Sequence, residues 1–215
     1  MSVRVAVVDS GINPDHPHVG EVRGGVFFHT EGESADYGDR IGHGTAVAGA
    51  IREKSPAAEL YAVRIFDRRL AASIEILMRG LEWCLDNGIQ VVNLSVGTAN
   101  ERHRAQLLDF VNRAHSREVF VVSASNMLPG MLEGAIAVAA DPECDRGTCR
   151  FRDGVFLASP YPRAIPGVPP EFNLNGTSFA IANVTALLVR ILETTKPSDA
   201  YRELVTSSSS SPLRR

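Results

Sequence analysis

Short apolar runs rich in valine and isoleucine recur along the chain, each bounded by turn residues, and this pattern constrains the fold most. Runs of this length without polar alternation are typical of strands buried on both faces. Between them lie segments with helical spacing, such as Ile74–Asn87 with a candidate N-cap at Ser73, and a second segment over residues 101–115. The alternation predicts an α/β fold with a doubly wound, mostly parallel sheet and helices on both faces. The predicted strands are Val3–Val8, Leu60–Phe66, Val91–Val96, Val119–Ala124 and Ala135–Ala140.

The size of the chain fits one globular domain. Its 215 residues are 44% hydrophobic and 22% charged, which is ordinary usage for such a domain. A domain of this size buries about 70% of its unfolded surface, so it needs neither disulfides nor a structural metal. We expect a single domain over residues 1–205. The segment Thr206–Arg215 contains five consecutive serines and predicts a disordered, serine-rich tail, because it cannot bury apolar area.

Charge and hydropathy exclude two classes of partner. The formal net charge is −3 and the basic residues do not gather, so we expect no nucleic-acid partner. No apolar run approaches the roughly 20 residues that span a bilayer, so we expect no membrane association. The first predicted strand begins close after Met1, and we therefore expect no signal peptide.

The chain has three cysteines, an odd number that fits a reducing compartment, and we expect a cytoplasmic location. Cys144 and Cys149 lie five residues apart in a polar segment, where a disulfide, half of a metal site or two ordinary loop thiols are all conceivable. Because no second Cys/His pair lies nearby, loop thiols are the preferred interpretation.

Three polar residues stand at the boundaries of predicted elements. In an open parallel sheet, ligands bind beyond the carboxyl ends of the strands. Asp9 ends the first strand, His43 precedes the helical stretch Ala46–Ile51, and Ser178 precedes the helical stretch Phe179–Leu192. An imidazole can take the proton of a hydroxyl nucleophile, and a buried carboxylate can fix the tautomer of that imidazole. These residues together predict nucleophilic acyl transfer.

Taken singly, each of these signals has another interpretation. Asp9 at a strand end could cap a helix or bind magnesium in a phosphoryl-transfer domain, but we find neither a partner acidic pair nor a phosphate-cradling glycine loop.

The remaining histidines show no metal-ligand spacing with acidic or cysteine partners, so solvated or core histidines are expected. We therefore expect no cofactor and no metal. These histidines are His16, His29, His103 and His115.

The motifs around the three residues carry a resemblance to a known family. The stretches Val5–Ile12, Gly42–Gly49 and Asn175–Ala180 resemble those of the subtilisin-like serine proteases (subtilases), and the similarity covers about residues 3–193. The order Asp, His, Ser along the chain is also that of subtilisin. The chain resembles a compact form of the family without a pro-region.

The resemblance implies a serine endopeptidase with Ser178 as nucleophile, His43 as general base and Asp9 orienting His43. It further implies that Asn126, after the strand that ends at Ala124, donates to the oxyanion. Without the resemblance to this family, Asn126 would be interpreted as a turn-forming residue.

The resemblance also implies that a peptide or protein substrate binds as an added β-strand. A single dedicated peptide or precursor is a possible substrate, and a separately encoded inhibitor or precursor peptide is a further candidate partner. A catalytically silent peptide-binding module of the same fold, a pseudoprotease, is the alternative. The candidate substrate-binding residues are Ser95, Val96 and Gly97 on one side and Leu70, Ala71 and Ala72 on the other.

The chain departs from the family pattern in three places. Phe179 follows the nucleophile where many relatives have methionine, and Ala182-Asn183 replaces the usual Pro-His. His18 stands where calcium-binding relatives have an aspartate, so the calcium site of those relatives is not expected here.

Overall fold

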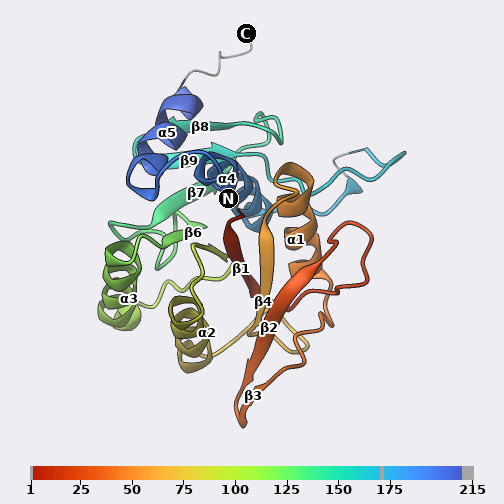
Figure 1. The fold of residues 1–215 in the computed structure, drawn as a ribbon, viewed down its shortest axis with the longest axis vertical. Helices are drawn as coiled ribbons and strands as arrows, with labels where there is room; N and C mark the ends of the chain where they lie inside the picture. Colours follow the sequence, from red (N-terminus) through yellow and green to blue (C-terminus); the bar gives the residue numbers. More distant parts are fainter. Residues whose placement is uncertain (1, 170–171, 210–215) are drawn as a thin grey trace.

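A nine-stranded sheet forms the centre of the molecule, and helices cover both of its faces (Figure 1). The computed structural model describes residues 2–169 and 172–209. The strand order is β3-β2-β4-β1-β5-β6-β7-β9-β8. The helices are α1 (His43–Lys54), α2 (Ile74–Asp86), α3 (Arg104–Ser116), α4 (Thr177–Leu192) and α5 (Pro197–Ser209), with a 3₁₀ turn η1 (Glu101–His103). The strands are β1 (Arg4–Asp9), β2 (Val22–His29), β3 (Gly32–Ser34), β4 (Glu59–Arg64), β5 (Val91–Leu94), β6 (Phe120–Ala124), β7 (Ile136–Ala140), β8 (Cys149–Arg152) and β9 (Val155–Ala158).

The inner strands of the sheet run parallel to one another; in spatial order they are β2, β4, β1, β5, β6, β7 and β9. The two edge strands, β3 and β8, are antiparallel to their neighbours. Side chains of β1 alternate between the two faces, as the period of a strand requires. Val5 and Val7 pack in the layer with α1, α4 and α5, whereas Ala6 and Val8 pack in the layer with α2 and α3. The predicted doubly wound α/β fold is therefore confirmed.

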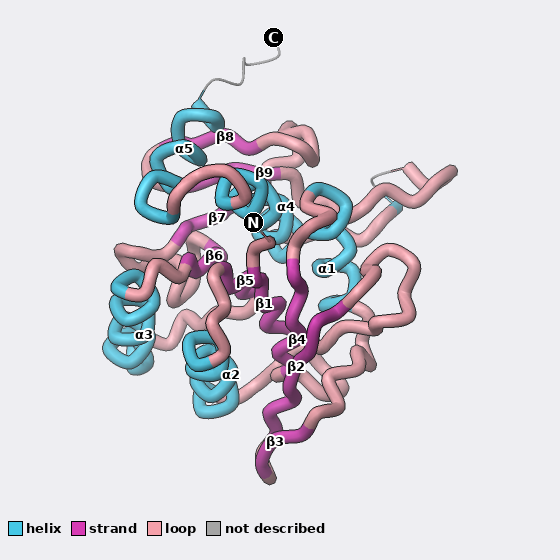
Figure 2. Tube along the Cα trace, viewed as in Figure 1, coloured by secondary structure: helices cyan, strands magenta, loops and turns pink. Residues whose placement is uncertain are grey.

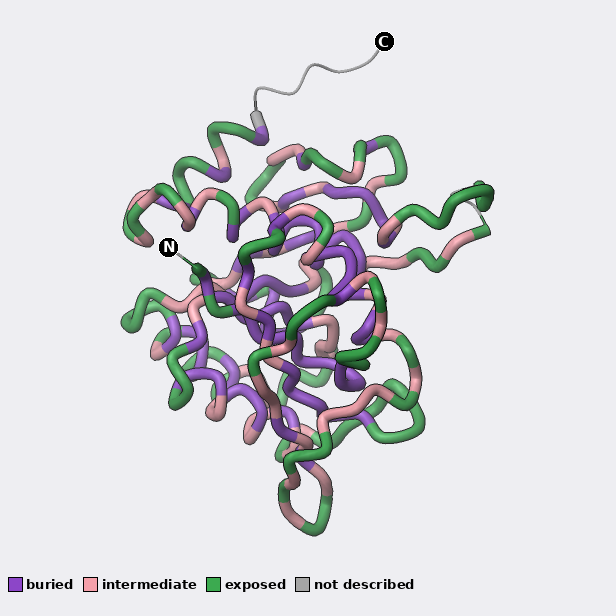
Figure 3. The backbone as a smooth tube through the Cα atoms, turned by 45° about the vertical axis from the view of Figure 1, so that its right-hand side comes forward, coloured by how far each residue is buried: buried purple, intermediate pink, exposed green. Residues whose placement is uncertain are grey.

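The arrangement of helices and strands is seen most simply along the Cα trace (Figure 2). Buried residues gather along the middle of the molecule and exposed residues lie at its periphery (Figure 3).

The helix predicted over residues 101–115 is divided into η1 and α3. The strand predicted over Val91–Val96 ends at Leu94.

The tail predicted from Thr206 begins too early. Helix α5 continues to Ser209, because Ala200 and Leu204 are buried against the core and anchor it. The hydroxyl of Ser208 donates to the carbonyl of Leu204 and contacts the thiol of Cys149, so this serine is 3% exposed. The rest of the predicted tail, residues 210–215, lies outside the described residues.

Candidate active site

Asp9 and His43 meet at the carboxyl edge of the sheet. Asp9 is the last residue of β1 and is fully buried, and His43 is the first residue of α1. His43 Nδ1 lies 2.7 Å from Asp9 Oδ1, and the same oxygen accepts a hydrogen bond from the backbone N–H of Ser10. A carboxylate only accepts, so Nδ1 carries a proton and Nε2 of the neutral ring is free to act as a base. The pairing of Asp9 with His43 is the geometry that general-base catalysis requires.

The surroundings of His43 favour its protonated form. Burial of the ring opposes the charge, but the hydrogen bond and charge of Asp9, together with the charge of Asp39, outweigh burial and raise the pKa of His43 above 6.5. The side chain of His43 is 18% exposed, so solvent or substrate can reach it. A base of this kind is neutral and ready to accept a proton in the neutral to alkaline range.

Helix α4 brings Ser178 to the same region. Gly176 precedes the helix with φ 151°, a backbone angle that side chains rarely adopt, and Ser178 occupies its first turn. The next residue, Phe179, is 2% exposed, and its ring centroid lies 5.7 Å from that of His43. Within the described residues, no hydrogen bond joins the Ser178 hydroxyl to His43. The start of α4 therefore packs against the imidazole of His43 through the ring of Phe179.

The other predicted site segments leave the same edge of the sheet. Strands β1, β5 and β6 are adjacent and parallel, so Asp9 at the end of β1 and Ser95 and Asn126 just after the ends of β5 and β6 leave the same edge of the sheet. Asn126 is exposed, and no hydrogen bond to its side chain is present in the described part of the chain. Two backbone hydrogen bonds between Thr98 and Leu128 connect the segments that follow β5 and β6. An unpartnered amide on a fixed loop is free to donate to a bound group.

The two predicted walls of the substrate groove follow the strands on either side of β1. Ser95, Val96 and Gly97 follow β5 and are half-buried. Leu70, Ala71 and Ala72 form the exposed connection between β4 and α2, and Leu70 is 51% exposed. Strands β4 and β5 lie on either side of β1, and Ala71 lines a cavity together with Phe27 and Ile76. Their roles in binding a substrate remain predictions.

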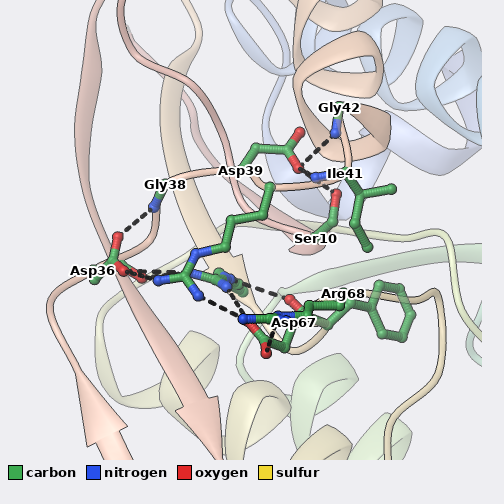
Figure 4. Close-up of polar contacts among 11 residues, drawn as sticks. Ser10, Asp36, Gly38, Asp39, Ile41, Gly42, Asp67 and Arg68 are labelled. Atoms are coloured by element: carbon green, nitrogen blue, oxygen red, sulfur yellow. Dashed lines mark hydrogen bonds and ion pairs between the residues drawn. The ribbon is translucent and has the colours of Figure 1, made fainter.

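Asp39 is a part of this region that the sequence analysis missed. Its carboxylate accepts hydrogen bonds from the hydroxyl of Ser10 and from the backbone N–H groups of Ile41 and Gly42 (Figure 4). Its other oxygen accepts from the backbone and hydroxyl of Thr45. Burial raises the pKa of Asp39, but these hydrogen bonds outweigh burial and lower it below 3.8. An aspartate shortly before a glycine that opens a helix is a helix-start signal, and that signal could have identified it.

A network of charges lies next to Asp39. Arg64, the last residue of β4, is fully buried, and its guanidinium donates to Asp67 and to the backbone of Asp36. Figure 4 shows Asp36 and Asp67 around this network, with Arg68 beside Asp67. The same guanidinium carbon lies 3.9 Å from the centroid of the Phe27 ring. These contacts fix the loop that carries Asp39 against the end of β4.

The remaining candidate groups form no further site. The thiols of Cys84, Cys144 and Cys149 are free and buried, so the disulfide that the sequence left open is not formed. Residues 2–169 and 172–209 contain no cluster of three or more His, Cys, Asp or Glu side chains that could hold a metal ion, and His18 belongs to none. In the same residues, no helix is both long and apolar enough to cross a bilayer.

Comparison with known proteins agrees with the fold and shows the family of the chain. The model of the subtilase family matches residues 1–149, and the chain belongs to this family of serine proteases. It is 35% identical to subtilisin Savinase from Lederbergia lenta in an alignment of 201 positions that covers 86% of this chain and 71% of that protein. It is 36% identical to M-protease from Shouchella clausii (strain KSM-K16), over 86% of this chain, and spans 53% of that relative's length. The crystal structure of a lanthipeptide protease has a similar fold, with a TM-score of 0.70 and 19% identity over 94% of this chain and 74% of that one.

Proposed function

We propose that the chain is a serine endopeptidase that hydrolyses peptide bonds through an acyl-enzyme. Ser178 is the nucleophile, His43 the general base and then acid, and Asp9 the group that orients His43. The observation that carries this proposal is the 2.7 Å hydrogen bond between His43 Nδ1 and the buried Asp9, with the start of α4 packed against the ring. Membership of the subtilase family supports the same chemistry.

In the first half of the reaction, Ser178 Oγ attacks the carbonyl carbon and its proton passes to His43 Nε2. The carbonyl oxygen gains the negative charge of the tetrahedral intermediate. The side-chain amide of Asn126 and the backbone N–H of Ser178 donate to this oxygen. The N–H of Ser178 lies in the first helical turn, where N–H groups lack partners within the helix and the helix dipole favours negative charge.

Collapse of the intermediate breaks the C–N bond, and the leaving amine takes its proton from His43. Water then attacks the acyl-enzyme, with His43 again accepting a proton, and releases the second product and free Ser178. Asp9 orients His43 and stabilises the imidazolium in both halves of the reaction.

For the substrate, we propose an extended peptide that adds a strand along Ser95, Val96 and Gly97, with Leu70, Ala71 and Ala72 on its other side. Backbone hydrogen bonds then supply affinity that depends little on sequence. A dedicated peptide or precursor in the cytoplasm is the substrate we favour over general protein degradation.

One observation favours the alternative of a silent peptide-binding module. The Ser178 hydroxyl makes no hydrogen bond to His43 in the described structure. Catalytic hydrogen bonds in ligand-free enzymes are often long and tighten only when substrate binds, so this geometry also fits an active protease. A silent module would bind peptides equally well with Ser178 or with alanine at this position, and would cleave neither.

The test is hydrolysis of casein and of a mixed fluorogenic peptide pool by purified chain. Ser178→Ala is expected to abolish turnover, and Asn126→Ala to reduce kcat by about 10²–10³, the loss that removal of one such donor causes in subtilisin. Ser116→Ala and Asn112→Ala, which change exposed residues of α3, are the matched controls. Turnover that persists in folded Ser178→Ala protein would refute the proposal, and binding without turnover in the wild type would establish the silent module.

A further inference from the structure

The carboxylate of Asp39 holds the helix that carries His43. Its oxygens accept from the N–H groups of Gly42 at 2.8 Å and Thr45 at 2.9 Å, both at the start of α1. Gly42 has no side chain to cap this helix and stands at φ 93°, a left-handed angle. Asp39 therefore supplies the cap from outside the helix, and its charge complements the positive end of the helix dipole. The first helical residue, His43, takes its position from this cap.

Ser10 connects this cap to Asp9. Its hydroxyl donates to Asp39 at 2.9 Å and accepts from the N–H of Gly44, also at 2.9 Å. Its own backbone N–H donates to Asp9 Oδ1 at 2.7 Å, the oxygen that also binds His43. Ser10 is fully buried, so its hydrogen bonds with Asp9 and with the N–H of Gly44 are shielded from water. The end of β1 and the start of α1 are thereby held in one arrangement.

The charge of Asp39 also acts on the imidazole. Asp9 from β1 and Asp39 from the loop before α1 both raise the pKa of His43, whereas α4 contributes the uncharged ring of Phe179. Asp39 stays ionised above its own lowered pKa, so its charge is present wherever His43 titrates. The other ionisable groups near Asp39 are His16, His18 and Arg163, which line the same cavity, and Arg64.

We propose that Asp39 is a positioning residue of the active site, which fixes His43 against Asp9 through Ser10 and places a second negative charge near the imidazole. It touches neither the substrate nor the reacting atoms. This role rests on the proposed function, because it requires His43 to be the base. Its loss should lower kcat and leave KM nearly unchanged, since a misplacement of about 1 Å costs up to about 10²-fold in rate.

The test compares wild type, Asp39→Asn and Thr45→Val. Thr45→Val removes one hydroxyl donor to Asp39, and keeps the charge. In the Ser178→Ala background, NMR titration of the His43 imidazole is expected to give a lower pKa for Asp39→Asn and an unchanged pKa for Thr45→Val. In the active background, the acid limb of kcat/KM should shift to lower pH in Asp39→Asn alone.

A folded Asp39→Asn protein with the wild-type pKa of His43 would show that Asp39 is only structural. The NMR titration needs no turnover, so it gives its answer even where the wild type proves inactive and the proposed function fails. If Asp39→Asn does not fold, the Ser10→Ala variant tests whether Asp39 positions His43 through Ser10. This variant is expected to lower kcat about 10-fold or more at unchanged KM and at an unchanged pKa of His43. A wild-type kcat in folded Ser10→Ala would overturn the proposed link.

Discussion

Replacement of Gly44 by alanine should disturb the Asp9–His43 pair directly. A Cβ at Gly44 would lie 2.2 Å from the carbonyl oxygen of Gly11 and 3.2 Å from Cβ of Asp9. Ordinary contact begins at 3.4 Å, so α1 and the segment after β1 must separate by about 1.2 Å. Both colliding groups near Gly11 are backbone, so no side chain can rotate away. This separation is expected to lengthen the hydrogen bond between Asp9 and His43 that orients the imidazole.

The expected magnitudes follow from this geometry. Overpacking costs about 1–3 kcal/mol, and removal of a helical glycine offsets up to about 1 kcal/mol. At about 2–4 °C per kcal/mol, the Tm of Gly44→Ala should fall by no more than about 12 °C. In contrast, a displacement of about 1 Å at the base lowers kcat/KM by up to about 10²-fold. Activity should therefore be lost in protein that is still folded.

The assay is kcat/KM on a fluorogenic peptide together with the Tm of each variant. Gly49→Ala in the same helix is the matched control, because its Cβ would meet His18 Cβ at an ordinary 3.4 Å. Gly49→Ala should keep both activity and Tm. Wild-type activity in Gly44→Ala, or an equal loss in Gly49→Ala, would refute the reasoning.

Three further predictions concern pH, metal and oxidation. Because the pKa of His43 is raised and the neutral ring is the base, kcat/KM should rise with pH along one limb centred above 6.5; a flat profile from about pH 5 to 9, with chemistry rate-limiting, would point to another base. Because the described residues hold no cluster of metal ligands, EDTA should leave the Tm unchanged, and a large loss that calcium restores would reveal a missed site. Because Phe179 lies beside His43 and cannot form a sulfoxide, peroxide should inactivate the wild type slowly, whereas Phe179→Met should keep substantial activity and become peroxide-sensitive. Met127 is 38% exposed next to Asn126, so Met127→Leu is the control, and equally fast loss in wild type, Phe179→Met and Met127→Leu would contradict the placement of Phe179.

The core of the sheet could be predicted from the sequence, but its edges could not. Buried central strands such as β1 and β5 are continuous apolar runs, and periodicity identifies them. Strand β2 contains Gly24 and Gly25, and β8 alternates apolar residues with arginines, so neither is a continuous apolar run. Helix α5 is stabilised by packing on the core, which outweighs the weak helical preference of its serines.

The candidate site divides in a similar way. Asp9 and His43 stand at element boundaries, where the sequence shows them, and the structure joins them. Asp39 acts through hydrogen bonds to backbone N–H groups, and its role depends on how the loop folds back onto α1. No local pattern sets the distance between Ser178 and His43, because it depends on the packing of α4 against α1.

Active-site labelling tests the central claim most directly. A fluorophosphonate reacts with a serine whose hydroxyl is activated by a neighbouring base, and mass spectrometry then identifies the modified residue. We expect one adduct per chain, on Ser178, and none in Ser178→Ala or in His43→Ala. Folded wild-type protein that stays unlabelled, or that carries its adduct on another serine, would contradict an Asp9–His43–Ser178 triad.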